Sequence, residues 1–290
     1  MKKNIIILLY LLISSSIYSQ NNMYLGSKEI AKKRIDKIKR ATGKIFVDGN
    51  KAGTGFYASS DGIIITNWHV VFGNHTKIDT VTGEIHSKFT FVDYKNDTIP
   101  LHILTDISRN EAVTNSLIWD YCVLKTATVN NTEFLKLGNF SDLYEGAAVY
   151  TCGYPLDLHD PFISNGMVST ITSQVVHKEL NYKRNISWVD MTMNKGNSGG
   201  ALMLMGDTPE DDLVVGITSF IITPEYNSLL ELDEYVSSME KKGTVELMGI
   251  NFLQYIKFIS SVVNSNSVGI SGAISIEEAK KDLDSNGFNK

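Results

Sequence analysis

The chain of 290 residues is poor in the features that mark several protein classes. It has two cysteines and five prolines, so neither a disulfide-rich scaffold nor a proline-rich linker is expected. Its net charge of −5 gives no electrostatic reason to expect nucleic-acid binding, because such proteins normally cluster Lys and Arg on one face. After the first twenty residues no stretch of about eighteen apolar residues occurs, so no membrane span is expected there.

The two cysteines, Cys122 and Cys152, are each flanked by apolar residues in segments that read as strands. Cysteine is among the residue types most often buried. We therefore predict two buried free thiols, although export would permit a disulfide.

The first residues have the pattern of a secretory signal. Lys2 and Lys3 precede an apolar run over residues 5–13, and a short serine-rich region follows up to Ser19. This run is too short for a mature membrane anchor. We predict a signal peptide over 1–19, a mature chain that starts near Gln20 without a stable membrane anchor, and a secreted or periplasmic location; an uncleaved anchor is the alternative.

The next segment, 20–43, is predicted to be helical. Isoleucines recur among charged residues between 27 and 40, Ser27 can cap the helix, and Glu29 places negative charge in its first turn. The basic residues of this helix are expected on a solvated face. They are Lys32, Lys33, Arg34, Lys37, Lys39 and Arg40.

After Gly43 the sequence changes to short runs of β-branched and aromatic residues between turn residues, which predicts an all-β fold. Residues 138–142 interrupt the pattern and mark a crossing between two lobes. The strands expected before it are 44–47, 55–58, 62–67, 88–93, 100–105 and 121–127. Those expected after it are 147–153, 163–176, 186–193, 201–205 and 213–222.

The end of the chain is predicted to be a polar tail, 264–290. Residues 282–287 read DLDSNG and match the opening half of an EF-hand calcium loop. Because the sequence stops before the bidentate acid that such a loop needs, we interpret this segment as a polar terminus. No catalytic metal is predicted, because no carboxylate lies at metal-ligand spacing from the histidines.

Two distant segments suggest chemistry. Ser198 lies in a glycine-rich turn, and His69 ends an apolar run. A serine hydroxyl is a weak nucleophile until a neighbouring base takes its proton, and that base needs an acid to hold its tautomer. Glycines at 196, 199 and 200 allow positive φ, so backbone N–H groups could point at a developing oxyanion.

Several motifs together resemble the trypsin-like (chymotrypsin-fold) serine proteases, and most closely their bacterial HtrA/Deg-type and glutamyl-endopeptidase-type branches. Residues 196–202 read GNSGGAL, 66–71 read TNWHVV and 120–125 read DYCVLK. Further similar segments are GYP at 153–155, NGMVS at 165–169, VVGITS at 214–219 and MGIN at 248–251.

The resemblance implies two packed six-stranded antiparallel β-barrels with an N-terminal and a C-terminal helix. The first barrel lobe is expected at 44–138, and the second at 139–263 with a closing helix over 252–263. Since too few residues follow 263 to build another domain core, we expect no PDZ domain of the kind that most HtrA/Deg proteases carry.

The resemblance also implies residue roles. Ser198 would attack the scissile carbonyl, His69 would act as base and acid, and Asp120 would orient the imidazole. Asp106 is the alternative acid. Gly196, Asn197 and Ser198 would form the oxyanion hole, with Asn197 shaping the turn; because Asn197 is uncharged, the site is not expected to need a freed amino terminus. The expected specificity pocket comprises Thr192, Met193, Ile217, Thr218, Ser219 and Phe220.

The predicted function is a serine endopeptidase that needs no cofactor and acts on protein or peptide substrates. The pocket contains no carboxylate, which favours a small or medium apolar residue before the cut, and an acidic residue next if His177 reaches the pocket. Two alternatives are a protease-fold binding protein whose cleft is occluded by 226–242, and an esterase on the same scaffold. The sequence leaves the oligomeric state open.

Overall fold

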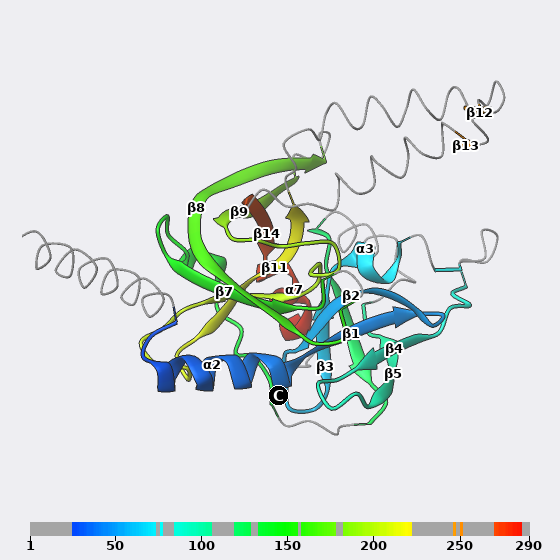
Figure 1. Ribbon diagram of the computed structural model, residues 1–290, viewed down its shortest axis with the longest axis horizontal. Helices are drawn as coiled ribbons and strands as arrows, with labels where there is room; N and C mark the ends of the chain where they lie inside the picture. Colours follow the sequence, from blue (N-terminus) through cyan, green and yellow to red (C-terminus); the bar gives the residue numbers. More distant parts are fainter. Residues whose placement is uncertain are drawn as a thin grey trace, which may run out of the picture.

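Two closed antiparallel β-barrels lie side by side in the computed structural model (Figure 1). The structure describes residues 25–73, 76–77, 84–105, 119–128, 133–155, 158–177, 182–221, 246–247, 250–251 and 270–285. The predicted signal peptide, the inserted segment 226–242 and the helix expected over 252–263 lie outside the described residues. The two barrels confirm the predicted fold class.

The first barrel has the strand order β1-β2-β3-β6-β5-β4. Each of its strands overlaps one of the six predicted in the first half of the chain. They are β1 (Thr42–Val47), β2 (Asn50–Tyr57), β3 (Ile63–Thr66), β4 (Phe89–Val92), β5 (Thr98–Ile103) and β6 (Cys122–Thr126).

Strand β3 shows why this sequence forms a packed pair of barrels. Its three isoleucines are all buried, although side chains in a strand alternate between two faces. Ile64 points into the core of the first barrel, whereas Ile63 and Ile65 belong to the cluster shared with the second barrel. A continuous apolar run is therefore required here, because both faces of the strand are covered.

The second barrel has the order β10-β11-β14-β9-β8-β7. In chain order, its first five strands overlap the predicted ones. The sixth, β14 (Ile270–Ser275), lies in the expected polar tail, so the lobe boundary predicted at 263 was wrong. The other strands are β7 (Ala148–Gly153), β8 (Phe162–His177), β9 (Tyr182–Asp190), β10 (Ala201–Leu204) and β11 (Leu213–Ile221). A separate two-stranded ladder joins β12 (Glu246–Leu247) and β13 (Ile250–Asn251).

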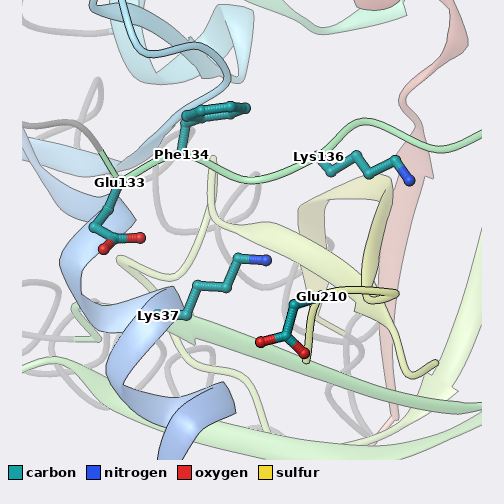
Figure 2. A pocket seen from close by; sticks show the side chains of 5 residues that line it. All are labelled: Lys37, Glu133, Phe134, Lys136 and Glu210. Carbon is teal, nitrogen blue, oxygen red and sulfur yellow. The ribbon is translucent and has the colours of Figure 1, made fainter. Parts of the chain in front are cut away.

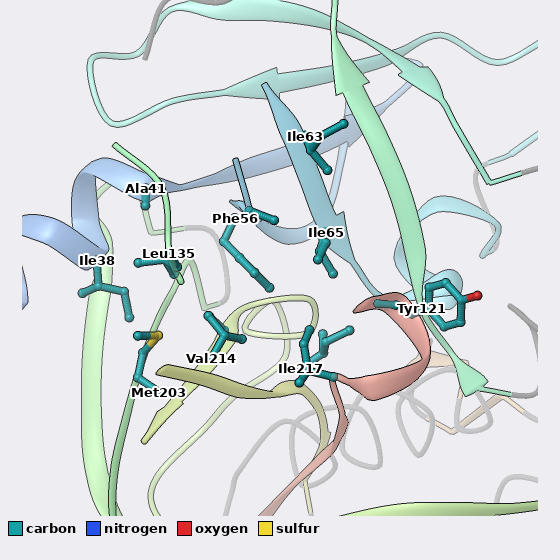
Figure 3. Close-up of a cluster of buried hydrophobic side chains, with 14 of the residues drawn as sticks. Ile38, Ala41, Phe56, Ile63, Ile65, Tyr121, Leu135, Met203, Val214 and Ile217 are labelled. Carbon is teal, nitrogen blue, oxygen red and sulfur yellow. The ribbon is translucent and has the colours of Figure 1, made fainter. Parts of the chain in front are cut away.

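A hydrophobic cluster between the barrels holds them together (Figure 3). Phe56 and Ile65 from the first barrel face Met203 and Val214 from the second, and all four are buried. Burying a side chain of this size stabilises a fold by about 1.5–3 kcal/mol. The relative position of the two barrels is thus set by packing, and it determines which residues can meet between them.

The N-terminal helix α2 (Lys28–Ala41) begins as predicted, with the Ser27 hydroxyl accepting a hydrogen bond of 3.4 Å from the Ile30 N–H. The prediction that its basic residues share a solvated face was wrong for Arg34, which is 2% exposed. Its guanidinium pairs with the buried Asp212, at 2.9 Å from Nε to Oδ2. Helix α2 is therefore attached to the second barrel before it leads into β1 of the first.

The chain continues from β14 into helix α7 (Glu277–Ser285), which buries Ala279 and Leu283 in the cluster between the barrels. Asp282 and Asp284 are helical, so the first residues of the EF-hand-like segment do not form a calcium loop. The helix satisfies its backbone hydrogen bonds internally, which a calcium loop does not do.

Both cysteines are free and buried, as predicted: Cys122 in the first barrel and Cys152 in the second. None of the helices in the described segments is both long and apolar enough to cross a membrane.

Candidate active site

His69 lies on the short helix α3 (Trp68–Val71), which follows β3 directly. Trp68 and Val70 on either side are buried, while the His69 side chain is 46% exposed. The buried neighbours fix the helix on the first barrel and leave the imidazole facing outward, where a substrate could reach it.

Asp120 lies next to His69. The Nδ1 atom of His69 is 3.0 Å from both carboxylate oxygens of Asp120, and the His69 backbone N–H donates to Oδ1 at 3.1 Å. The Asp120 backbone has a φ of 56°, a left-handed conformation that Asp adopts more readily than most residues. The Nδ2 of Asn67 donates to the Asp120 carbonyl at 3.0 Å and so supports this conformation.

The environment of Asp120 keeps its carboxylate charged. Burial alone raises the pKa, but the hydrogen bond and the charge of His69 lower it, and the hydroxyl of Ser219 lowers it further. The net effect is a pKa below the usual aspartate value. At neutral pH this charged carboxylate can hold the His69 Nδ1–H and stabilise an imidazolium.

Ser198 occupies a tight turn at the end of the second barrel. Gly196 and Gly199 have φ values of 103° and 89°, which favour glycine. The Asn197 N–H donates to the Asn194 carbonyl, and the Gly200 N–H donates to the Asn197 carbonyl, each at 3.0 Å. These two hydrogen bonds hold part of the backbone around Ser198 within the turn.

Gly53 in β2 lies between the segments that carry His69 and Ser198. A Cβ atom placed on Gly53 would be 2.7 Å from Cγ2 of Val70 and 2.9 Å from the Ser198 carbonyl oxygen. The residue after His69 and the main chain of Ser198 thus approach the same backbone position. No hydrogen bond joins the His69 ring to the Ser198 hydroxyl within the described residues; such bonds are often long in free enzymes and shorten when substrate binds.

The backbone N–H groups of the turn fall into two kinds, those that bond within the turn and those that are left for a ligand. Among the described residues, neither the Gly196 N–H nor the Ser198 N–H has an acceptor, whereas the Asn197 N–H is used inside the turn. The Asn197 side chain is 4% exposed and packs against Gly153. Gly196 and Ser198 therefore have the donors that could bind a carbonyl oxygen, and Asn197 shapes the turn.

The structure places the predicted pocket residues in different surroundings. Thr192 is exposed, Met193 lies in the core of the second barrel, and Ile217 is buried between the barrels. The Thr218 hydroxyl donates to the Asn197 carbonyl at 2.7 Å, and the Ser219 hydroxyl donates to Oδ2 of Asp120 at 2.7 Å. The side chains of Phe220 and His177, and the whole of Asp106, lie outside the described part of the structure.

Sequence reasoning missed the roles of Thr54 and Asn67. Thr54 is fully buried and hydrogen-bonds to the Ser198 turn, and Asn67 supports Asp120. A signal for Thr54 was available, because Gly53 and Gly55 flank it inside a strand, where glycine often marks the close approach of another backbone.

A pocket of about 300 Å³ lies elsewhere, between α2, the segment that links the barrels and the β10–β11 turn (Figure 2). None of the predicted site residues lines it; its lining is Lys37, Glu133, Phe134, Lys136 and Glu210. Within the described part of the chain, no three His, Cys, Asp or Glu side chains gather closely enough to hold a metal ion.

Comparisons with known proteins show the family. A family model described as a trypsin-like peptidase domain matches residues 53–217, more than half of the chain. The chain is 34% identical over 178 residues to human serine protease HTRA4, covering 59% of this chain and 31% of that protein. It is 30% identical over 172 residues to the magnetosome formation protease MamE of Paramagnetospirillum magneticum, covering 59% and 20%. The chain thus spans less than a third of the length of these relatives.

Among solved structures, the chain resembles the HtrA-type protease AlgW with a decapeptide, with a TM-score of 0.54 and 15% identity over 88% of this chain and 66% of that one. A second AlgW structure, with a tripeptide, gives a TM-score of 0.55 and 16% identity over 88% and 64%. At this level of identity the likeness concerns the fold.

Proposed function

Because the chain belongs to the trypsin-like peptidase family, we propose that it is a serine endopeptidase that hydrolyses peptide bonds through an acyl-enzyme on Ser198. One observation carries the proposal: the first barrel presents His69 paired with Asp120 beside the turn on which the second barrel presents Ser198.

In the proposed reaction, the Ser198 hydroxyl gives its proton to Nε2 of His69 while Oγ forms a bond to the substrate carbonyl carbon. The carbonyl π electrons move to oxygen, and the N–H groups of Gly196 and Ser198 stabilise the resulting oxyanion. When the tetrahedral intermediate collapses, the C–N bond breaks and His69 returns the proton to the leaving amine. Water then repeats the sequence with the acyl group and releases Ser198.

Asp120 contributes through position and charge. Its carboxylate accepts the Nδ1–H of His69, which leaves Nε2 as the basic nitrogen. Its lowered pKa keeps it ionised throughout the neutral range, so it can offset the positive charge that the imidazole acquires.

The substrate and location belong to the same proposal. Protein or peptide chains are the proposed substrates, and the basic, apolar and serine-rich start of the sequence supports export to the periplasm or the medium. N-terminal sequencing of protein recovered outside the cytoplasm tests this; the expected first residue is Gln20.

A fluorophosphonate probe followed by peptide-library digestion tests the activity. We expect labelling of the wild type at Ser198, no labelling of Ser198→Ala, and cleavage of library peptides by the wild type alone. A wild type that reacts with neither probe nor peptide would favour the occluded binding protein. Cleavage of small esters with intact peptides would favour the esterase.

A further inference from the structure

The hydroxyl of Thr54 connects the two barrels at the nucleophile turn. Thr54 lies in β2 of the first barrel and is fully buried. Its hydroxyl donates to the Gly196 carbonyl at 2.7 Å, and its backbone N–H donates to the Ser198 carbonyl at 2.9 Å. Two carbonyls of a turn in the second barrel are therefore fixed by one residue of the first.

The other hydrogen-bonding groups of Thr54 are also used. Its hydroxyl oxygen accepts the Tyr154 N–H at 3.1 Å, and its carbonyl accepts the Thr66 hydroxyl at 2.7 Å. Thr66 ends β3, three residues before His69. Thr54 thus joins the strand that leads to the proposed base, the turn that carries the proposed nucleophile, and the end of β7.

Gly196 needs such an external contact. With a φ of 103° and no Cβ atom, it has little steric preference of its own, and rotation about its bonds would reorient the N–H groups at 196 and 198. From within the second barrel, the Thr218 hydroxyl donates to the Asn197 carbonyl. Thr54 supplies the corresponding contact from the first barrel, so it selects one orientation of the turn.

We propose that Thr54 is a positioning residue for the oxyanion hole: its hydroxyl, bonded to the Gly196 carbonyl, keeps the N–H groups of Gly196 and Ser198 aimed at the developing charge. This inference rests on the proposed peptidase function. It assigns a kinetic role to a residue that touches neither the substrate nor the His69 and Asp120 pair.

Thr54→Val tests the proposal, because it removes the hydroxyl and keeps the shape and the backbone N–H. Thr54→Ser restores the hydroxyl without the methyl group. Thr151→Val is the matched control: Thr151 is also a buried strand threonine, but its hydroxyl has no hydrogen-bond partner among the described residues. All three are compared with the wild type on one peptide chosen from the library.

We expect Thr54→Val to lower kcat by about 10- to 100-fold, somewhat less than the loss of an oxyanion donor itself, with KM changed less than about threefold. The affinity for a peptide boronate, which mimics the tetrahedral oxyanion, should fall in parallel with kcat, whereas affinity for the product peptide should not. The pH profile of the remaining activity should keep its shape, because the His69 and Asp120 pair is untouched. Thr54→Ser should recover kcat to within about threefold, and Thr151→Val should not lower it.

If the wild type is active and Thr54→Val has the same kcat and boronate affinity, the positioning role of Thr54 is overturned while the proposed peptidase function stands. The positioning role is also overturned if Thr54→Ser lowers kcat by about 10-fold or more relative to the wild type, since the methyl group would then be what matters. This comparison remains decisive if Thr54→Val does not fold. A wild type that neither labels nor cleaves peptides overturns the proposed function, and this inference with it.

Discussion

The Ser219 hydroxyl donates a 2.7 Å hydrogen bond to Oδ2 of Asp120, which also lies 3.0 Å from Nδ1 of His69. The first barrel supplies Asp120 and His69, and β11 of the second barrel supplies Ser219. The carboxylate is therefore shared by both barrels, and its orientation depends on their relative position.

Removing the Ser219 hydroxyl should destabilise the charged form of Asp120. We expect Ser219→Ala to raise the Asp120 pKa and to lower the free energy of unfolding by about 1–2 kcal/mol at pH 7. Because the pKa of Asp120 is lowered in the folded protein, the charged carboxylate contributes its full stabilisation of the fold above the ordinary aspartate pKa of about 3.9. This contribution is lost as the pH falls through the folded-state pKa. Urea unfolding at several pH values between 3 and 7 measures the difference.

In Ser173→Ala, which alters an exposed serine bonded to Asn185, the free energy of unfolding should differ little from wild type at any pH in that series. A loss in Ser219→Ala that is equally large at pH 3 and pH 7 would contradict the assigned role of the carboxylate charge.

Gly199 is predicted to tolerate no side chain. A Cβ atom there would lie 2.0 Å from the Thr54 carbonyl oxygen and 2.2 Å from the Thr66 hydroxyl, and its φ is 89°. Gly49→Ala is the matched control, because its φ of 80° is similar but nothing lies within 4 Å. We expect Gly49→Ala to cost about 1–2 kcal/mol of stability with activity kept, and Gly199→Ala to cost more and to reduce kcat by over about 100-fold. Equal effects of the two substitutions on stability and kcat would show that the close approach is unimportant.

The buried pair of Arg34 and Asp212, which attaches helix α2 to the second barrel, should contribute strongly to the free energy of unfolding. The Tyr150 hydroxyl and the Gly206 N–H also donate to Asp212, at 2.7 and 2.8 Å, and would remain after Arg34→Met. Leaving a buried carboxylate without its cation should still cost about 3–5 kcal/mol. Lys33→Met, which alters an exposed 4.0 Å pair on the same helix, should cost less than about 0.5 kcal/mol. Urea denaturation compares the two, and similar small losses in both would contradict the prediction.

The two thiols should be unreactive in the folded protein. Burial raises the pKa of both Cys122 and Cys152 to about 12, so at pH 8 almost no thiolate is present. We expect no reaction with a disulfide reagent in buffer and two reacting thiols per chain in denaturant. Ser173→Cys, which places a thiol at an exposed position, serves as the positive control. Rapid labelling of either natural cysteine in the native protein would be the contrary result.

Particular residues show how far the sequence could be interpreted. The run of isoleucines in β3 and the alternating segments around it have strong strand propensity, so the strands of the first barrel could be predicted from them, whereas their closure into a barrel followed from the family resemblance. Strand β14 reads ISGAIS, with small residues and a glycine that have weak propensity, and it is a strand because β9 and β11 pair with it on both sides. That pairing is non-local and leaves no periodicity to detect.

The amino-acid sequence by itself determined the all-β class, the first helix with its cap, and the residue types from which a triad could be built, because propensity and short motifs are properties of neighbouring residues. Tertiary structure alone decided that Arg34 is buried, that β14 completes a barrel, and that Ser219 bonds to Asp120 while Thr54 bonds to the Ser198 turn. These contacts join residues far apart in the chain, and their partners become known only when the two barrels pack against each other.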